Sequence, residues 1–150
     1  MRSVKGFTLI ELMVALVILG VALTLGSASF SGSLERTRAD ADANELLHVF
    51  SWARLQAINN SAVVTVSALN DEDWTQDVEV ELNGQVIRSL PGFRGGAVVV
   101  ATGDVDEVAF DALGGLGTPG NAVTFTYTRG DQTRTVLLCP TGRAQSGGGC

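Results

Sequence analysis

Residues 7–25 read FTLIELMVALVILGVALTL, an apolar run that contains one charged side chain, Glu11. A helix rises about 1.5 Å per residue, so about 20 such residues cross the roughly 30 Å hydrocarbon core of a membrane. Arg2 and Lys5 lie just before the run, and the next basic residue is Arg36. Because basic residues favour the cytoplasmic side, this asymmetry predicts one transmembrane helix with its N-terminus in the cytoplasm.

Glu11 is an unfavourable residue in such a helix. A carboxylate costs about 2.5–3.5 kcal/mol at the centre of a membrane helix and less near its ends. Two interpretations are open, namely an acid tolerated near the interface or a carboxylate that meets a partner charge. The small residues of GSASFSG (26–32) also leave open a secretory cleavage site after Ala28.

Length and charge narrow the function classes. The 150 residues are enough for one domain with a core. The formal net charge of −6 argues against nonspecific attraction to nucleic acid or to anionic lipid. The chain has no Cys-x-x-Cys motif and a single histidine, so a metal site is not expected.

Residues 33–60 contain no proline or glycine and extend the helix beyond the apolar run. Small and apolar residues recur there at helical spacing, which predicts a stripe that packs on a globular domain. Phe50 and Trp52 are expected in the core, whereas His48 is expected at the surface. The stripe comprises Ala39, Ala43, Leu46, Phe50, Ala53 and Ala57.

After residue 60 the hydrophobic period changes from about 3.6 to about 2, which predicts strands. Asn83-Gly84 predicts a tight hairpin turn, and residues 129–131 (Arg-Gly-Asp) predict another turn. The fold class is therefore α+β, with a long N-terminal helix packed against a mostly antiparallel β-sheet domain. The expected strands are residues 62–69, 77–82, 85–90, 97–101, 107–111, 122–128 and 133–138.

Two motifs that suggest ligand sites fit loops better. Residues 115–120 satisfy G-x-G-x-x-G, but they lead into a strand pattern, so a hairpin loop is expected instead of a dinucleotide site. The acidic run 71–73 lacks the alternating ligands of a calcium loop. No Gly-x-Ser-x-Gly motif and no acid/base pair is evident. Neither an enzyme nor a cofactor is expected.

The segment KGFTLIEL (5–12) resembles the processing site of the type IV pilin superfamily, the class III signal peptides. The resemblance implies that a prepilin peptidase cleaves after Gly6 and methylates the new N-terminal amine of Phe7. It also implies that Glu11 pairs with the N-terminal amine of a neighbouring subunit during assembly. A charge that is unfavourable alone in lipid then specifies docking, which favours the partner-charge interpretation.

The same resemblance implies how the chain is organised. Residues 1–6 are a leader peptide, 7–26 a transmembrane and filament-core helix, 27–60 its amphipathic continuation, and 61–150 a β-rich periplasmic domain. Loss of the two basic leader residues leaves a formal charge of −8. The protein is expected in the bacterial inner membrane, in contact with lipid, and in a pilus or pseudopilus after assembly.

Patterns along the rest of the chain, which are less specific than the N-terminal segment, resemble the FimT/GspH branch of this superfamily. They are Ala53-Arg54 and Ala57 before residues 63–66, Trp74, residues 108–111 leading into glycines, and residues 136–138 before Gly142-Arg143. The branch implies a helix against two β-sheets, and a minor pilin near the tip of a type IV pilus. The alternative is a GspH-like minor pseudopilin of a type II secretion system.

Cys139 and Cys150 are the only cysteines, and both lie near the C-terminus. In an oxidising periplasm they are expected to form a disulfide that closes the C-terminal tail. A pair of free thiols is the alternative.

DNA binding in natural transformation is a function of another class. Some FimT-like minor pilins bind DNA through basic residues that include a C-terminal Gly-Arg-x-Arg, and residues 142–145 (Gly-Arg-Ala-Gln) lack its second arginine. Arg129, Arg134 and Arg143 are the candidate DNA contacts. The negative net charge opposes this function, because DNA affinity depends on neutralising several phosphates.

Overall fold

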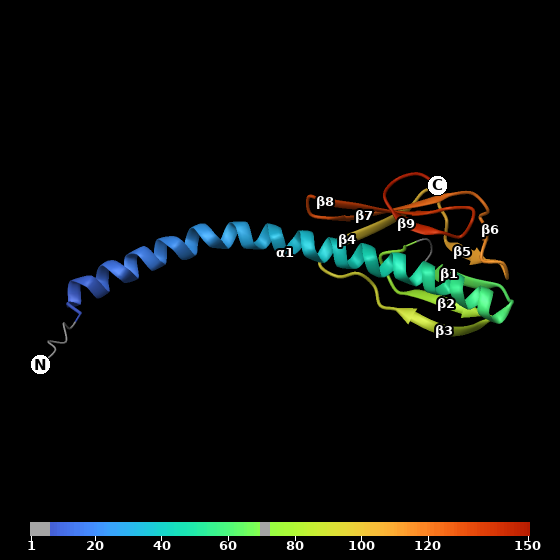
Figure 1. Ribbon diagram of the computed structural model, residues 1–150, viewed down its shortest axis with the longest axis horizontal. Helices are drawn as coiled ribbons and strands as arrows, with labels where there is room; N and C mark the ends of the chain where they lie inside the picture. The colour runs from blue at the N-terminus through green and yellow to red at the C-terminus, as the bar shows by residue number, and fades with distance from the viewer. Residues whose placement is uncertain (1–6, 70–72) are drawn as a thin grey trace, which may run out of the picture. The chain divides into compact units, whose positions relative to one another are not determined.

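The computed structural model describes residues 7–69 and 73–150, with the backbone alone described at residues 23–31. Helix α1 runs from Leu9 to Asn60 (Figure 1), so the long N-terminal helix expected from the sequence is present. Within the described ranges, no helix combines the length and the apolarity needed to cross a membrane. The chain divides after Glu35 into two compact units.

The second unit holds the last part of α1 and two antiparallel sheets (Figure 1). Sheet A has the strand order β3-β2-β1-β5-β6, and sheet B has the order β4-β7-β8-β9. The α+β class and the arrangement of one helix against two sheets are thereby confirmed. The strands are β1 (Val64–Ala68), β2 (Val78–Leu82), β3 (Gln85–Leu90), β4 (Ala97–Ala101), β5 (Glu107–Phe110), β6 (Leu116–Thr118), β7 (Val123–Arg129), β8 (Gln132–Leu138) and β9 (Ala144–Ser146).

Every strand expected from the sequence is present, with ends that differ by at most two residues. The Asn83-Gly84 turn joins β2 to β3 with φ values of 53° and 75°, the left-handed conformation of a tight hairpin. The prediction of a hairpin loop at residues 115–120 is wrong in part, because Leu116–Thr118 forms β6 against β5. Neither β6 nor β9 is predicted by the sequence, since strands of three residues are too short to show alternation.

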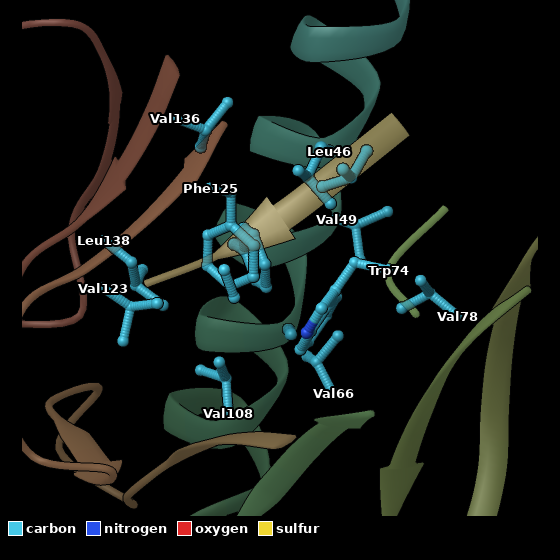
Figure 2. Packing of buried hydrophobic residues seen from close by; sticks show 14 of the residues in the cluster. Leu46, Val49, Val66, Trp74, Val78, Val108, Val123, Phe125, Val136 and Leu138 are labelled. Atoms are coloured by element: carbon cyan, nitrogen blue, oxygen red, sulfur yellow. The ribbon is translucent and has the colours of Figure 1, made fainter. Parts of the chain in front are cut away.

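The core lies where the second half of α1 meets both sheets (Figure 2). The helix stripe expected between residues 39 and 57 is buried along its whole length. Trp74, in the loop before β2, is also fully buried, and its ring centroid lies 4.8 Å from that of Phe125. The indole Nε1–H of Trp74 donates to the Val105 carbonyl oxygen at 2.6 Å, which satisfies its polar group inside the core.

Trp52 packs against the edge of this core, so the sequence prediction of a core residue is confirmed only in part. Its side chain is half-buried, whereas Phe50 and Ala53 are fully buried. Successive helical residues point about 100° apart, so Trp52 lies beside the buried stripe. His48 is exposed, as the sequence predicts, and lies one turn before Trp52 on the same side of the helix.

Candidate assembly site

Reciprocal hydrogen bonds close the N-terminal end of α1. The backbone N–H and the hydroxyl of Thr8 both donate to Glu11 Oε2, each at 3.0 Å. The backbone N–H of Glu11 donates to Thr8 Oγ1 at 3.3 Å. Thr8 and Glu11 therefore form a capping box, which satisfies N–H groups that the first helical turn leaves without partners. The Glu11 carboxylate has a hydrogen-bonding partner within its own chain.

The helix around Glu11 exposes apolar side chains in every direction. All described side chains of residues 7–22 are exposed, and Phe7 and Leu9 are 89% and 76% exposed. A helix that is apolar on all sides is stable only in apolar surroundings. Within residues 7–22, Glu11 is the single ionisable side chain. The segment is thus an apolar surface whose one charged side chain is Glu11. Gly6, on the other side of the expected cleavage position, lies outside the described residues.

Two of the three candidate DNA-contacting arginines pair with aspartates of α1. Arg129 Nη1 lies 3.3 Å from Asp42 Oδ2, and Arg134 Nε lies 2.6 Å from Asp40 Oδ1. The Tyr127 hydroxyl donates to the same Asp42 carboxylate. Burial, together with this hydrogen bond, raises the pKa of Tyr127 above its ordinary value. Arg129 and Arg134 therefore connect sheet B to the helix.

Arg143 lies apart from these two arginines. It is exposed, and it lies in the turn between β8 and β9. Arg129 and Arg134 lie at the opposite end of the β7–β8 hairpin. The structure does not bring the three candidate residues into one basic patch.

Gly142 forms part of a close junction that the sequence does not predict. A Cβ atom at Gly142 would lie 1.9 Å from the Gly114 carbonyl oxygen, and the φ of Gly142 is +73°. Arg54 Nε donates to the same carbonyl oxygen at 2.7 Å. Beside it, the Leu116 N–H donates to the Pro140 carbonyl oxygen at 2.9 Å. The junction therefore joins α1, the loop before β6 and the turn before β9.

The C-terminal tail is closed by a disulfide between Cys139 and Cys150. Cys139 is buried at the end of β8, whereas Cys150 is exposed. Such a bond restricts the unfolded chain, and an entropic model gives a stabilisation of somewhat under about 3 kcal/mol for a loop of this length.

Two family models match the chain. The model described as "Type II transport protein GspH" matches residues 42–142. The chain belongs to the GspH family. The model described as "Prokaryotic N-terminal methylation motif" matches residues 1–27, which include the capping box and the start of α1.

Similar proteins are pilins and pilin-like proteins. Pilin-like protein PilA1 of Thermus thermophilus is 32% identical over an alignment 154 residues long, which covers 94% of this chain and 97% of PilA1. The crystal structure of the type IV minor pilin FimU of Pseudomonas aeruginosa has a TM-score of 0.66 at 25% identity, over 79% of this chain and 92% of FimU. A second crystal form of FimU has a TM-score of 0.63 at 24% identity, over 73% and 92% of the two chains.

This GspH-family protein is a minor pilin or pseudopilin of the type IV pilin superfamily. Its methylation motif supports prepilin processing and assembly with other pilin subunits. The pilins that it resembles are structural subunits and not enzymes. Among the described side chains, no three His, Cys, Asp or Glu residues form a group that could hold a metal ion.

Proposed function

We propose that this protein is a minor subunit of a type IV pilus, present in few copies near the pilus tip. One observation carries the proposal. In the exposed apolar helix of residues 7–22, Glu11 is the only charge and lies in the first turn. An apolar helix with a single carboxylate at its start is suited to a bundle in which each subunit meets the N-terminus of another.

Maturation begins in the inner membrane, where prepilin peptidase removes residues 1–6 and methylates Phe7. Residues 7–26 lie in the lipid before assembly and in the filament core afterwards. Residues 27–60 continue the helix, and residues 61–150 form the domain outside the membrane. The order of events follows from the apolar surface, which needs lipid until other subunits replace it.

Assembly exchanges the partners of Glu11. In the free subunit, Thr8 supplies the hydrogen bonds to the carboxylate, which reduces the unfavourable free energy of this charge in an apolar environment. The amine of Phe7 in a neighbouring subunit carries a positive charge, and charge-assisted hydrogen bonds are stronger than neutral ones. A subunit docked in the wrong register would leave both charges buried and unpaired. Glu11 therefore selects the register of assembly.

The type II secretion pseudopilus is the second candidate machine, because the matching family model carries the name of a type II transport protein. The names of FimU and PilA1 support the pilus instead. Sheared surface filaments should contain the protein if it is a pilus subunit, and immunogold label should collect near their ends. Loss of type II secretion in a deletion strain, with normal pili, would favour the pseudopilus.

DNA binding is not part of the proposal. Arg129 and Arg134 already pair with Asp42 and Asp40, and Arg143 lies at the other end of the hairpin. A mobility shift at low salt that Arg143→Ala abolishes would reinstate this function.

Processing is tested by the N-terminal sequence and mass of the protein from membranes of cells with and without prepilin peptidase. We expect a chain that begins at N-methylated Phe7 only when the peptidase is present. A chain that begins after Ala28, or that stays uncleaved between Gly6 and Phe7 in both strains, would contradict the proposal.

A further inference from the structure

The described part of the second unit contains four half-buried arginines: Arg54, Arg88, Arg129 and Arg134. Three of them donate to an oxygen acceptor, which is the Gly114 carbonyl for Arg54 and an aspartate for Arg129 and Arg134. Arg88 differs from them. Within residues 7–69 and 73–150 its guanidinium forms no hydrogen bond or ion pair, and its Cζ lies over the Trp52 ring, 5.2 Å from the centroid.

Arg88 lies at the rim of a hollow between sheet A and α1. It stands on β3, the edge strand of the sheet, in register with Val80. Because Val80 is buried on the inner face, Arg88 points towards the helix. The hollow has a volume of about 530 Å³ and is lined by Ala41, Asn44, Glu45, His48, Trp52 and Arg88.

The guanidinium of Arg88 is placed to bind a carboxylate. Its cation–π contact with the Trp52 ring does not use its N–H donors, which remain available. Those donors form a planar fork that matches the two oxygens of a carboxylate. The amide of Asn44 and the imidazole of His48 line the same hollow and add donors.

Glu45 limits what the hollow can accept. It is the one acidic side chain in the lining, and it forms no ion pair with Arg88 among the described residues. The Glu45 carboxylate repels any anion in the hollow, and the repulsion is weaker for a single carboxylate than for a polyanion such as a nucleic acid.

We propose that the Arg88 hollow binds an acidic side chain of a neighbouring subunit in the filament. The inference rests on the proposed function, because the filament is what brings subunits side by side. The mature chain carries 8 basic and 16 acidic side chains. On a chain with twice as many acidic as basic side chains, Arg88 is a cation whose donors are unused, so it offers an attractive contact to an acidic side chain of a neighbour.

The site itself is tested with the purified full-length chain in detergent micelles, with glutarate as the probe. We expect glutarate to shift the Nε–Hε NMR resonance of Arg88 saturably, while sodium chloride at equal ionic strength does not. The indole N–H of Trp52 should follow the same titration curve, and Arg88→Gln should abolish its response. No shift with glutarate, or a shift at lower concentrations of inorganic phosphate than of glutarate, overturns the carboxylate site.

The neighbouring subunit is tested in cells by the fraction of the protein recovered in sheared filaments. Arg88→Gln should lower this fraction about fivefold or more. Arg88→Lys should recover it only in part, because an ammonium keeps the charge but not the fork. Arg143→Gln is the control, since it removes an exposed arginine outside the hollow and should leave incorporation unchanged.

The melting temperature and membrane level of Arg88→Gln separate docking from a structural role. Incorporation at the wild-type level, or a loss only in proportion to a lower membrane level and melting temperature, overturns the inference. If the wild-type chain is absent from filaments while glutarate still shifts Arg88, the proposed function fails and the carboxylate site stands.

Discussion

The two halves of α1 reach stability in opposite ways. Residues 39–57 place a stripe of small and apolar side chains against the two sheets, and that stripe is buried. Residues 9–22 bury none of their described side chains, although they are more apolar. The first half therefore depends on apolar surroundings outside its own domain, and the second half depends on its own chain. One continuous helix therefore contains two kinds of segment. Residues 9–22, the assembling half, are left for contacts outside the domain, and residues 39–57, the folding half, are part of the folded domain.

The sharpest test of this comparison is a large-to-small substitution in each half. Phe50→Ala should lower the free energy of unfolding by about 3–5 kcal/mol, because Phe50 is fully buried beside Trp74 and Phe125. Leu16→Ala is the matched control. Leu16 is 60% exposed, so its truncation should change the free energy by less than about 0.5 kcal/mol.

Denaturant unfolding of both full-length variants in detergent, followed by the fluorescence of Trp52 and Trp74, measures the two values. Equal losses would show that the two halves of α1 unfold as one unit, and the comparison would be wrong.

A second test examines the junction at Gly142 and Gly114, which Arg54 joins to the buried half of α1. Gly142→Ala should lower the free energy of unfolding by about 3 kcal/mol, because its Cβ would clash with the Gly114 carbonyl at a positive φ. Gly148→Ala is the control. Gly148 also has a positive φ, +82°, but no atom lies within 4 Å of its Cβ position. Its loss should be about 1 kcal/mol, the strain alone. Similar losses in the two variants would indicate that the junction at Gly114 does not constrain the fold.

A third test uses Tyr127, the single tyrosine of the chain. Burial and the Asp42 carboxylate raise its pKa in the folded state. As pH rises, the unfolded chain therefore loses this proton first. The contribution of Tyr127 to stability is complete below about pH 10 and is lost as pH rises through the folded-state pKa.

Tyr127→Phe should lower the free energy of unfolding by about 1–2 kcal/mol at neutral pH, through loss of a hydrogen bond to a charged acceptor. The variant should then lose less stability than the wild type between neutral and alkaline pH. Ultraviolet titration of the folded wild type measures the pKa directly. An ordinary value would contradict the role of Asp42.

The smallest expected effect is at the start of the assembling half. Thr8→Val removes the hydroxyl of the capping box and should destabilise the first turn by about 1 kcal/mol. Hydrogen exchange in detergent should then be about fivefold faster at residues 10–13 and unchanged at residues 39–57. Faster exchange in both segments would mean that the two halves are coupled.

Local patterns in the sequence predict much of this molecule. The helix stripe and the strand alternation are repeated over several residues, so they indicate the elements and the α+β class. The Thr8-x-x-Glu11 spacing is also local, and it could have predicted the capping box.

Other features depend on residues that are distant in the chain. Asp42 and Tyr127 are 85 residues apart, and Arg54 and Gly114 are 60 residues apart. The periodicity of hydrophobic residues in a short stretch of sequence does not predict contacts between such distant residues. The placement of Trp52 under Arg88 depends likewise on which strand forms the edge of sheet A. The sequence therefore predicts the assembling segment better than the contacts that hold the folded domain together.

The buried stripe of α1 has a mechanical consequence. It runs from Ala39 to Ala57, and at about 1.5 Å per residue it extends for roughly 27 Å along the helix axis. A pull along that axis loads all of these contacts in shear at once, whereas a pull across it would peel them apart one after another. Tension carried along a filament through its helices would therefore meet the domain in its stronger direction.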